Sequence, residues 1–408
     1  MSDSHQKLSP IALLAVLSVA QLLAMSSFAN FAVLLNEFTV EWSLSSTQAG
    51  WIGGIYFAGY VAAVPFLVGL TDVLDARRIY LFGLFCGILG SVGFALFADG
   101  FFSAMIFRFL AGVSLAGTYM PGLQILNDRL NEVDRQKVLP WYLSAFSIGT
   151  AGSYFFTGVA SAMMPWSSVF LLAGVCQLGC VVLVYFAIPG KRPKWLNPSD
   201  RHPLDFRPVL RNKTALAYIW GYTGHSYELF AYRAWIVAFL IFAASASGAT
   251  MSREAVAGFA ALFSLLGAPA SVMGAHLCLK QDRGKTISVV MMLSVIVGTI
   301  LGFIGALPFV VVLAVAGLYS VFIMSDSAAL TSGVVAAARE GERGATLATH
   351  SVMGFSGGFL GPLVVGLVLD LGAGPQSIQG WTFAFAVTAA GSLFALMGLR
   401  YLLRRQSN

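Results

Sequence analysis

The residues best suited to chemistry gather between positions 218 and 235, inside a stretch that is otherwise apolar. They are Tyr218, Tyr222, His225, Glu228, Tyr232, Arg233 and Trp235. On a helix of about 100° per residue, Tyr218, His225 and Tyr232 share one narrow stripe. Glu228 lies about 60° to one side of that stripe and Arg233 about 80° to the other. Such a broad polar and aromatic face predicts a ligand cavity, in which rings form apolar walls and a few polar groups orient the ligand.

Two members of this group are spaced for proton transfer. His225 and Glu228 stand at i and i+3 on the predicted helix, so their side chains can touch. A carboxyl group beside an imidazole in a semi-apolar cavity can load and release a proton near neutral pH. The pair therefore suggests proton coupling. The alternative is that both side chains hydrogen-bond to neighbouring helices and hold this stretch in place.

The solvent around these residues must be lipid. The chain of 408 residues is 58% apolar and 10% charged, and its mean hydropathy is +0.80. A water-soluble domain of this composition would expose a very large apolar surface. With about 20 residues as the length of one span, we expect twelve membrane-spanning helices. Their approximate ranges are 11–35, 49–68, 79–98, 101–125, 138–163, 166–188, 214–243, 253–277, 285–304, 308–335, 345–370 and 379–402.

The cations between these spans predict one orientation. All but three of the 24 lysines and arginines fall in segments on one side, which the positive-inside rule assigns to the cytoplasm. Of the exceptions, Arg253 lies on the other side, and Arg108 and Arg233 lie within spans. We therefore expect a multi-pass protein of the cell inner (plasma) membrane with both termini cytoplasmic. The net charge of +6 then reflects a basic rim facing anionic lipid, not nucleic-acid binding. The first span is too long for a cleavable signal peptide.

Charged residues within the spans are further functional candidates. Each costs about 2.5–3.5 kcal/mol at mid-membrane, so each must be paired, hydrated or facing a cavity. Arg108 and Arg233 can hold an anionic group such as a carboxylate, although Arg108 can instead pair helices and Arg233 can form a gate salt bridge. Asp326 can bridge a cation or be a satisfied structural carboxylate. Lesser candidates are Asn30, Tyr56, Tyr60, Tyr119, Gln124, Tyr154 and His350.

The two halves of the chain look like repeats. A polar segment at 190–213 divides the spans six and six, which predicts an N-terminal bundle at 1–189, a cytoplasmic linker at 190–213 and a C-terminal bundle at 214–408. After the second span stands Gly-Leu-Thr-Asp-Val-Leu-Asp-Ala-Arg-Arg (Gly69 to Arg78). After the eighth stands Lys-Gln-Asp-Arg-Gly-Lys (Lys280 to Lys285). An acid followed by cations at matching places indicates duplicated six-helix bundles.

With these loop motifs, the chain resembles the major facilitator superfamily of secondary transporters over essentially its whole length. The resemblance implies that Asp72 meets helix ends and basic residues to lock the cytoplasmic side when the protein faces outward. Arg77 and Arg78 keep the family pattern. In the second half, Asp282 is the acid that corresponds to Asp72, and Arg283 is the cation that follows it. Three positions depart from it: Val68 and Asp75 replace a glycine, and Val73 replaces an arginine. The alternative role of Arg77 and Arg78 is topology anchoring.

Other motifs narrow the function. Arg108-Phe-Leu-Ala-Gly112 is similar to an Arg-x-x-x-Gly pattern that related transporters use in proton coupling or substrate contact. The fifth span lacks the Gly-Pro signature of drug/proton antiporters. The second span lacks the arginine that related nitrate transporters place there. The glycines around Pro362 in the eleventh span predict close helix contact or a kinked pocket wall.

We therefore expect an all-α membrane protein of two pseudo-symmetric six-helix bundles that moves a small organic anion by proton-coupled alternating access. Alternatives are a nitrate-, nitrite- or cyanate-like inorganic-anion transporter and a drug efflux antiporter. A receptor or scaffold on a transporter fold is the non-transport alternative. No enzyme motif or metal-ligand pattern is visible, so we expect no enzymatic activity, no cofactor and no metal. The expected partners are the solute, protons and membrane lipid, with the chain a monomer.

Overall fold

The structure is a computed structural model that describes residues 8–71, 73–191, 207–339 and 342–404. Over these residues it is helical, without strands. The first half contains α1 (Pro10–Ala24), α2 (Asn30–Glu41), α3 (Ser46–Leu70), α4 (Ala76–Phe97), α5 (Phe101–Arg129), α6 (Glu132–Met163) and α7 (Trp166–Ala187). The second half contains α8 (Arg207–Arg211), α9 (Lys213–Ala246), α10 (Arg253–Lys280), α11 (Arg283–Phe303), α12 (Phe309–Ser325), α13 (Ser327–Ala337), α14 (Arg343–Leu371) and α15 (Ile378–Arg404).

The helices account for the twelve predicted spans. Within the described residues, ten helical segments are long and apolar enough to cross a membrane, with α12 and α13 together forming one of them. The other two predicted spans are α6 and the broken pair α1–α2. The prediction of an all-α, twelve-span fold is therefore confirmed. Asp75 and Asp282 each cap the helix that follows the loop motif, α4 and α11, so the two halves repeat this turn in structure as well as in sequence.

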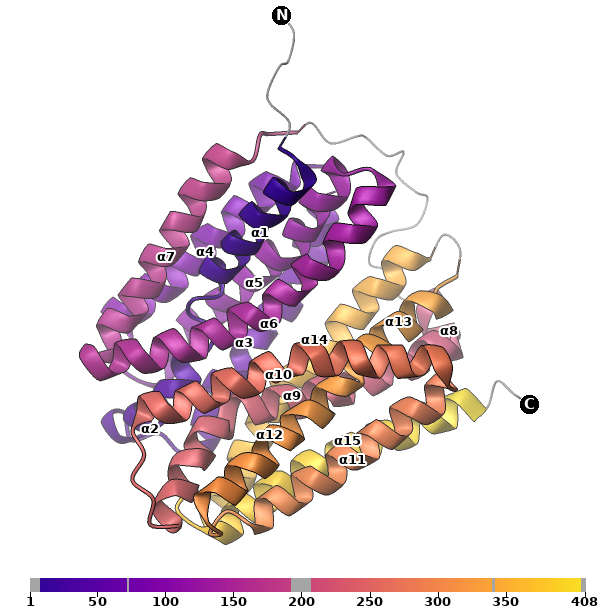
Figure 1. Ribbon diagram of the computed structural model, residues 1–408. Helices are drawn as coiled ribbons and strands as arrows, with labels where there is room; N and C mark the ends of the chain where they lie inside the picture. Colours follow the sequence, from indigo (N-terminus) through magenta and orange to yellow (C-terminus); the bar gives the residue numbers. More distant parts are fainter. Residues whose placement is uncertain (1–7, 72, 192–206, 340–341, 405–408) are drawn as a thin grey trace, which may run out of the picture.

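In the described chain, the packing between the two halves is concentrated toward one end. Helices α3 and α14, α6 and α10, and α2 and α9 pack across the boundary. We call the end that carries the α2–α3 turn and the end of α14 the outer end, and the end that carries α8, the start of α1 and the end of α15 the inner end. Figure 1 shows the two halves diverging toward the inner end. α1, the inner part of the first span, is not among the helices that pack on the second half, whereas α2 is.

The first and tenth spans are broken inside the bundle. Residues 25–29 interrupt the first span, and the main-chain groups exposed there find partners from other helices. The amide of Ala29 donates to Ser153 Oγ at 2.9 Å, and Gln177 Nε2 donates to the carbonyl of Ala24 at 3.3 Å. The tenth span breaks at Asp326. Irregular backbone at membrane depth is stable only where protein or a cavity satisfies it, so breaks of this kind mark functional regions of transporters.

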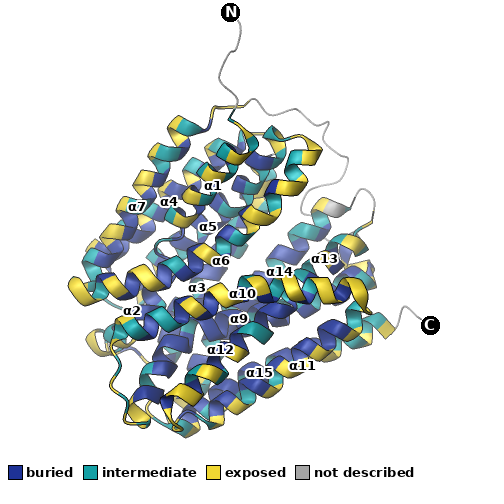
Figure 2. Cartoon of the chain, viewed as in Figure 1, coloured by how far each residue is buried: buried dark blue, intermediate teal, exposed yellow. Residues whose placement is uncertain are grey.

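Helix α9 lies at the centre of the second half. In the most apolar stretch of α9, 72% of the residues are buried, a larger share than in any other candidate span of the described chain. Figure 2 accordingly shows α9 dark along its length beneath the partly exposed α10 and α12. A helix buried on all sides presents its polar residues to several neighbours. The expectation that one face of residues 218–235 lines one cavity is therefore wrong in that detail.

Candidate functional site

A small cavity lies where the two halves meet. Its volume is about 30 Å³, room for only a few water molecules. Aromatic rings form a large part of its wall, and two arginines, one from each half, supply the charge. The lining consists of Phe28, Ala29, Phe31, Ala32, Leu35, Ala49, Gly53, Tyr56, Phe57, Arg108, Tyr154, Phe230, Arg233, Ala234 and Trp235.

Arg108 reaches the cavity from α5. Its side chain is 5% exposed, and its guanidinium carbon lies 4.7 Å from the ring centroid of Tyr56 and 5.9 Å from that of Phe31. Nη1 donates to the carbonyl of Ser27, in the break of the first span, at 3.3 Å. Nε is buried and has no hydrogen-bond partner in the described part of the chain. The rings stabilise the cation, but its donors are not all used.

Arg233 reaches the same cavity from α9. It is also 5% exposed, and its guanidinium lies 5.7 Å from the centroid of Phe230. Its buried Nη1 has no hydrogen-bond partner among the residues described. The backbone carbonyl of Arg233 accepts a hydrogen bond from Tyr154 Oη of α6, so the two halves are joined directly beside the cavity.

Among the described residues, neither arginine is in an ion pair with an acid. Ion pairs between described residues include Arg129–Asp75, Arg135–Glu132, His225–Asp326 and Arg253–Glu37, and none of these includes Arg108 or Arg233. An unpaired buried cation is costly, and an anion between two guanidinium groups removes that cost while using their free N–H donors. The first turn of α2 also lines the cavity through Phe31 and Ala32, and a helix N-terminus carries partial positive charge. The cavity is thus suited to an anion.

Glu228 lies away from the cavity, inside the second half. Its Oε1 accepts hydrogen bonds from Ser294 Oγ of α11 and Tyr319 Oη of α12, both at 2.8 Å. Its Oε2 accepts one from Ser392 Oγ of α15, also at 2.8 Å. Three hydroxyl groups therefore hold the carboxylate where no cation pairs with it in the described residues. Glu228 and Arg233 point apart because five residues on a helix correspond to about 140° of rotation.

His225 pairs with Asp326 rather than with Glu228. Its Nδ1 lies 2.7 Å from Oδ1 of Asp326, at the break between α12 and α13, and both side chains are at least 95% buried. Tyr222 stacks on His225 at 5.3 Å between ring centroids, and its ring lies 4.1 Å from that of His350 of α14 in a tilted arrangement. The expected His225–Glu228 pair is therefore not formed, because the two side chains turn toward different helices of the same half.

The remaining predicted residues contact neighbouring helices. Tyr232 Oη donates to the carbonyl of Ala316 at 3.0 Å, and Asn30 Oδ1 accepts from Thr157 Oγ1 at 2.7 Å. The ring of Tyr60 lies 4.1 Å from that of Phe355, across the boundary between the halves. Of the residues predicted to line a cavity, Arg108, Arg233, Tyr56, Tyr154 and Trp235 do so in the described part of the chain. The glycines of the eleventh span form close contacts, since a Cβ at Gly357 or Gly361 would strike the backbone of α9.

The outer end is closed by polar contacts between the halves. Asp370, near the end of α14, accepts hydrogen bonds from the amides of Ser46 and Thr47 at 2.8 and 2.7 Å, at the first turn of α3. Arg253 of α10 pairs with Glu37 of α2 at 2.7 Å. Sequence reasoning missed the role of Asp370, because an acid at the end of a span is unremarkable and its partners lie 324 and 323 residues away.

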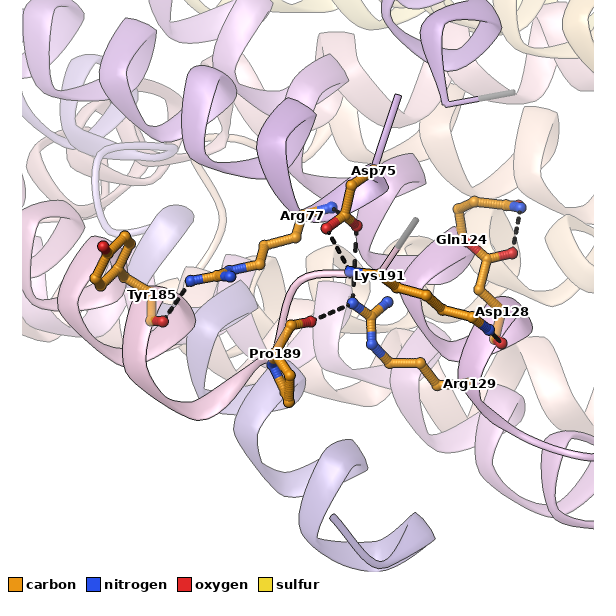
Figure 3. A network of polar contacts seen from close by, with 8 residues as sticks. All are labelled: Asp75, Arg77, Gln124, Asp128, Arg129, Tyr185, Pro189 and Lys191. Carbon is orange, nitrogen blue, oxygen red and sulfur yellow. Dashed lines mark hydrogen bonds and ion pairs between the residues drawn. The ribbon is translucent and has the colours of Figure 1, made fainter. Parts of the chain in front are cut away.

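At the inner end, a polar network ties the first half together (Figure 3). Asp75 accepts hydrogen bonds from the amides of Arg77 and Lys191 at 3.1 and 2.8 Å, and lies 3.7 Å from Nη2 of Arg129. The guanidinium of Arg77 donates to the carbonyl of Tyr185 on α7. Asp75, a departure from the family pattern, is thus the centre of the network.

Among the described residues, the predicted gating residues Arg78, Asp282 and Arg283 are not part of this network. Asp72 lies outside the described residues. Arg78 is exposed. In the second half, Asp282 caps α11 by accepting from the amide of Lys285 at 2.7 Å. Arg283, the first residue of α11, has a buried Nε without a hydrogen-bond partner in the described part of the chain.

Comparison with known proteins confirms the resemblance drawn from the loop motifs. The family model described as Major Facilitator Superfamily matches residues 17–362. A crystal structure of a bacterial homolog of the human lysosomal transporter Spinster, in an inward-facing and occupied conformation, superposes with a TM-score of 0.78 at 14% identity, covering 96% of both chains. That likeness shows the shared fold.

Curated relatives match only part of their length. A Bacillus subtilis (strain 168) protein named for niacin and nicotinamide transport is 24% identical over 42% of both chains. An Escherichia coli (strain K12) protein named for L-galactonate transport is 23% identical over 49% of this chain and 47% of its own. Multidrug resistance protein MdtL of Salmonella typhi is 25% identical over 42% of this chain and 44% of its own. The chain thus aligns with less than half of the length of each relative.

Proposed function

The chain belongs to the major facilitator superfamily, and on that premise we propose that it moves a small organic anion across the membrane by proton-coupled alternating access. The observation that carries the proposal is the pair Arg108 and Arg233, one from each half, both buried in one aromatic cavity without an acidic partner among the described residues. An anion bound between them would link the halves, so its binding and release would be coupled to their relative motion.

The chemistry of the cavity favours a carboxylate with an apolar or planar body. Guanidinium groups bind carboxylates through paired N–H donors, and the rings of Phe28, Phe57 and Phe230 provide an apolar surface. The name of the relative associated with L-galactonate agrees with this class, and that of the niacin and nicotinamide relative includes one carboxylate, niacin, beside an uncharged amide. A cationic drug would meet two uncompensated positive charges. An inorganic anion is the second candidate, since a cavity of about 30 Å³ holds only a small ion without expanding.

For proton coupling, we propose the buried pair His225 and Asp326, with Glu228 as a second protonatable group. The pair bridges α9 to the break between α12 and α13, so its charge state can alter how these helices pack. Glu228 accepts three hydroxyl hydrogen bonds. Protonation would make it a donor and require one hydroxyl to reorient.

The packing supports a rocking motion of two bundles about the cavity. The described contacts close the outer end, through Asp370 and through the Arg253–Glu37 pair, while α1 and α13 at the inner end pack within their own halves. We propose the halves at 1–189 and 214–408 as the moving bundles, with the inner end cytoplasmic in the plasma membrane by the positive-inside rule. We propose a monomer, because the cavity is built within one chain.

The test is ligand-induced thermal stabilisation of the purified protein with a panel of monocarboxylates, sugar acids, inorganic anions and cationic drugs. Wild type is compared with Arg108→Gln and Arg233→Gln. Arg78→Gln is the matched control, because Arg78 is an exposed cation outside the cavity. We expect one class of organic anion to stabilise wild type and the control, and each cavity variant to bind at least about ten-fold more weakly, as loss of a charged hydrogen bond predicts.

Other outcomes would assign another function. Stabilisation by nitrate-like ions alone would favour the inorganic-anion transporter, and stabilisation by cations would favour drug efflux. A receptor or scaffold would bind none of the panel and would tolerate both arginine substitutions in its cellular activity. Proton coupling is checked by the same titrations at about pH 5.5 and 7.5, on either side of the range in which imidazole titrates. A pH dependence that survives both Asp326→Asn and Glu228→Gln would contradict the proposed coupling groups.

A further inference from the structure

A second hollow lies on the outside of the second half, between α11 and α15. It has a volume of about 580 Å³ and is lined by Ser288, Val289, Met292, Leu393, Leu396, Met397, Arg400, Tyr401 and Arg404. Leu396 and Ser288 are buried and form its floor, whereas Val289, Met292 and Met397 are 57%, 40% and 55% exposed. We refer to these nine residues as the α11–α15 groove.

The groove is apolar along most of its length and cationic at one end. Arg400 and Arg404 lie in the last two turns of α15, at the inner end of the span. Leu393 and Met397 lie toward the middle of the membrane, about 10 and 5 Å from Arg400 at 1.5 Å rise per residue. Lys285 is exposed one turn before Val289 on the same face of α11 and adds a further positive charge. The acid near this end, Asp282, is engaged as the N-cap of α11.

The charge at the inner end is held in place. Arg400 Nε donates to Ser288 Oγ at 2.6 Å across the two helices. This bond leaves the two terminal amino groups of the guanidinium available at the rim. Arg400 is in no ion pair with an acid in the described part of the chain. A fixed guanidinium above an apolar channel matches a molecule with an anionic head and a hydrocarbon tail.

We propose that the α11–α15 groove is a binding site for an anionic glycerophospholipid of the inner leaflet. Its phosphate lies against Arg400, and one acyl chain lies along Val289, Met292 and Met397. Because the surface faces hydrocarbon, a lipid is the molecule always present there at high concentration, and cations at the inner end attract anionic headgroups. Such a lipid would connect α11 to α15, two helices of the second half that are otherwise bridged here by Arg400 and Ser288.

The test is photocrosslinking of the full chain in phosphatidylcholine nanodiscs that contain a small fraction of phosphatidylglycerol with a diazirine in its acyl chain. Labelled peptides are mapped by mass spectrometry. We expect labels within 288–292 and 393–401, displaced by unlabelled phosphatidylglycerol but not by phosphatidylcholine or inorganic phosphate. Arg400→Gln should reduce this labelling about five-fold, the loss of about one interfacial cation. Arg400→Lys, which keeps the charge, should retain most of it.

Two controls separate the site from general effects. Arg78→Gln removes an exposed cation of the other half and should leave the labelling unchanged. Met397→Trp fills the groove without changing charge and should reduce the labelling, while size-exclusion chromatography verifies that each variant is folded. Equal labelling with a diazirine phosphatidylcholine, or unchanged labelling in Arg400→Gln, would overturn the proposal. Displacement by inorganic phosphate would indicate a phosphate site instead and would overturn the lipid proposal.

Discussion

Replacing Asp370 tests whether the outer contacts hold the two halves together. Its carboxylate accepts hydrogen bonds from the amides of Ser46 and Thr47, at the start of α3, across the boundary between the halves. Asp370 of the second half therefore caps the N-terminus of α3 in the first half. A buried pair of such bonds would contribute several kcal/mol, but Asp370 is solvent-exposed, so we assign about 1 kcal/mol, as for loss of an ordinary N-cap. This corresponds to about a five-fold shift toward the outward-open state in Asp370→Ala.

The shift can be measured by double electron–electron resonance between spin labels at Val40 on α2 and Leu307 on the loop before α12, both exposed at the outer end. We expect a larger population at long distance in Asp370→Ala. Asp99→Ala is the control, because Asp99 bonds only to Ser103 of its own half in the described contacts. The reasoning is refuted if Asp370→Ala leaves the distance distribution unchanged, or if Asp99→Ala shifts it equally.

Two further predictions concern packing. Gly112→Ala should lower the free energy of unfolding by about 1–3 kcal/mol, because the new Cβ would overlap the carbonyl of Tyr56 on α3. At Gly152 a new Cβ would meet only the ring of Phe156, at an ordinary contact distance of 3.9 Å. Gly152→Ala should therefore leave that energy unchanged or raise it by up to about 1 kcal/mol through helix propensity; equal losses in denaturant titrations would contradict this. Tyr154→Phe should cost about 1 kcal/mol, because it removes a hydroxyl that bonds across the two halves. Tyr60→Phe should cost nothing measurable, since its hydroxyl has no hydrogen-bond partner among the described residues, and an equal cost in both variants would count against the bond.

The contrast between His225 and Arg233 shows how far sequence patterns reach at the site. Helical periodicity correctly indicated that the polar residues of α9 occupy different angles, and their cost in lipid indicated that each needs a partner. Periodicity did not indicate that α9 is surrounded by protein. The polar residues that were predicted to line one cavity therefore lie in three separate environments. His225 meets Asp326, Glu228 meets three hydroxyls, and Arg233 meets the cavity.

The loop motif after the second span shows the same limit of sequence patterns. Sequence similarity directed attention to Asp72 and treated Asp75 as a departure from the pattern. The structure places Asp75 at the centre of the inner network, with Arg129 and Lys191 as partners. These partners come from the end of α5 and from the segment that follows α7, which no local pattern brings together. Asp282 caps α11 in the second half as Asp75 caps α4 in the first, so the repeat is visible at both levels.

The sequence by itself determined the class of protein, the number of spans and the repeat, because these depend on local properties: span length, apolar content and the positions of cations. It also identified Arg108 and Arg233 as residues that need compensation, since the cost of a buried charge is independent of the fold. Only the tertiary structure decided that both face one cavity and that neither has an acidic partner in the described chain. Those facts depend on helices more than 100 residues apart, whose rotation and packing no single stretch of sequence specifies.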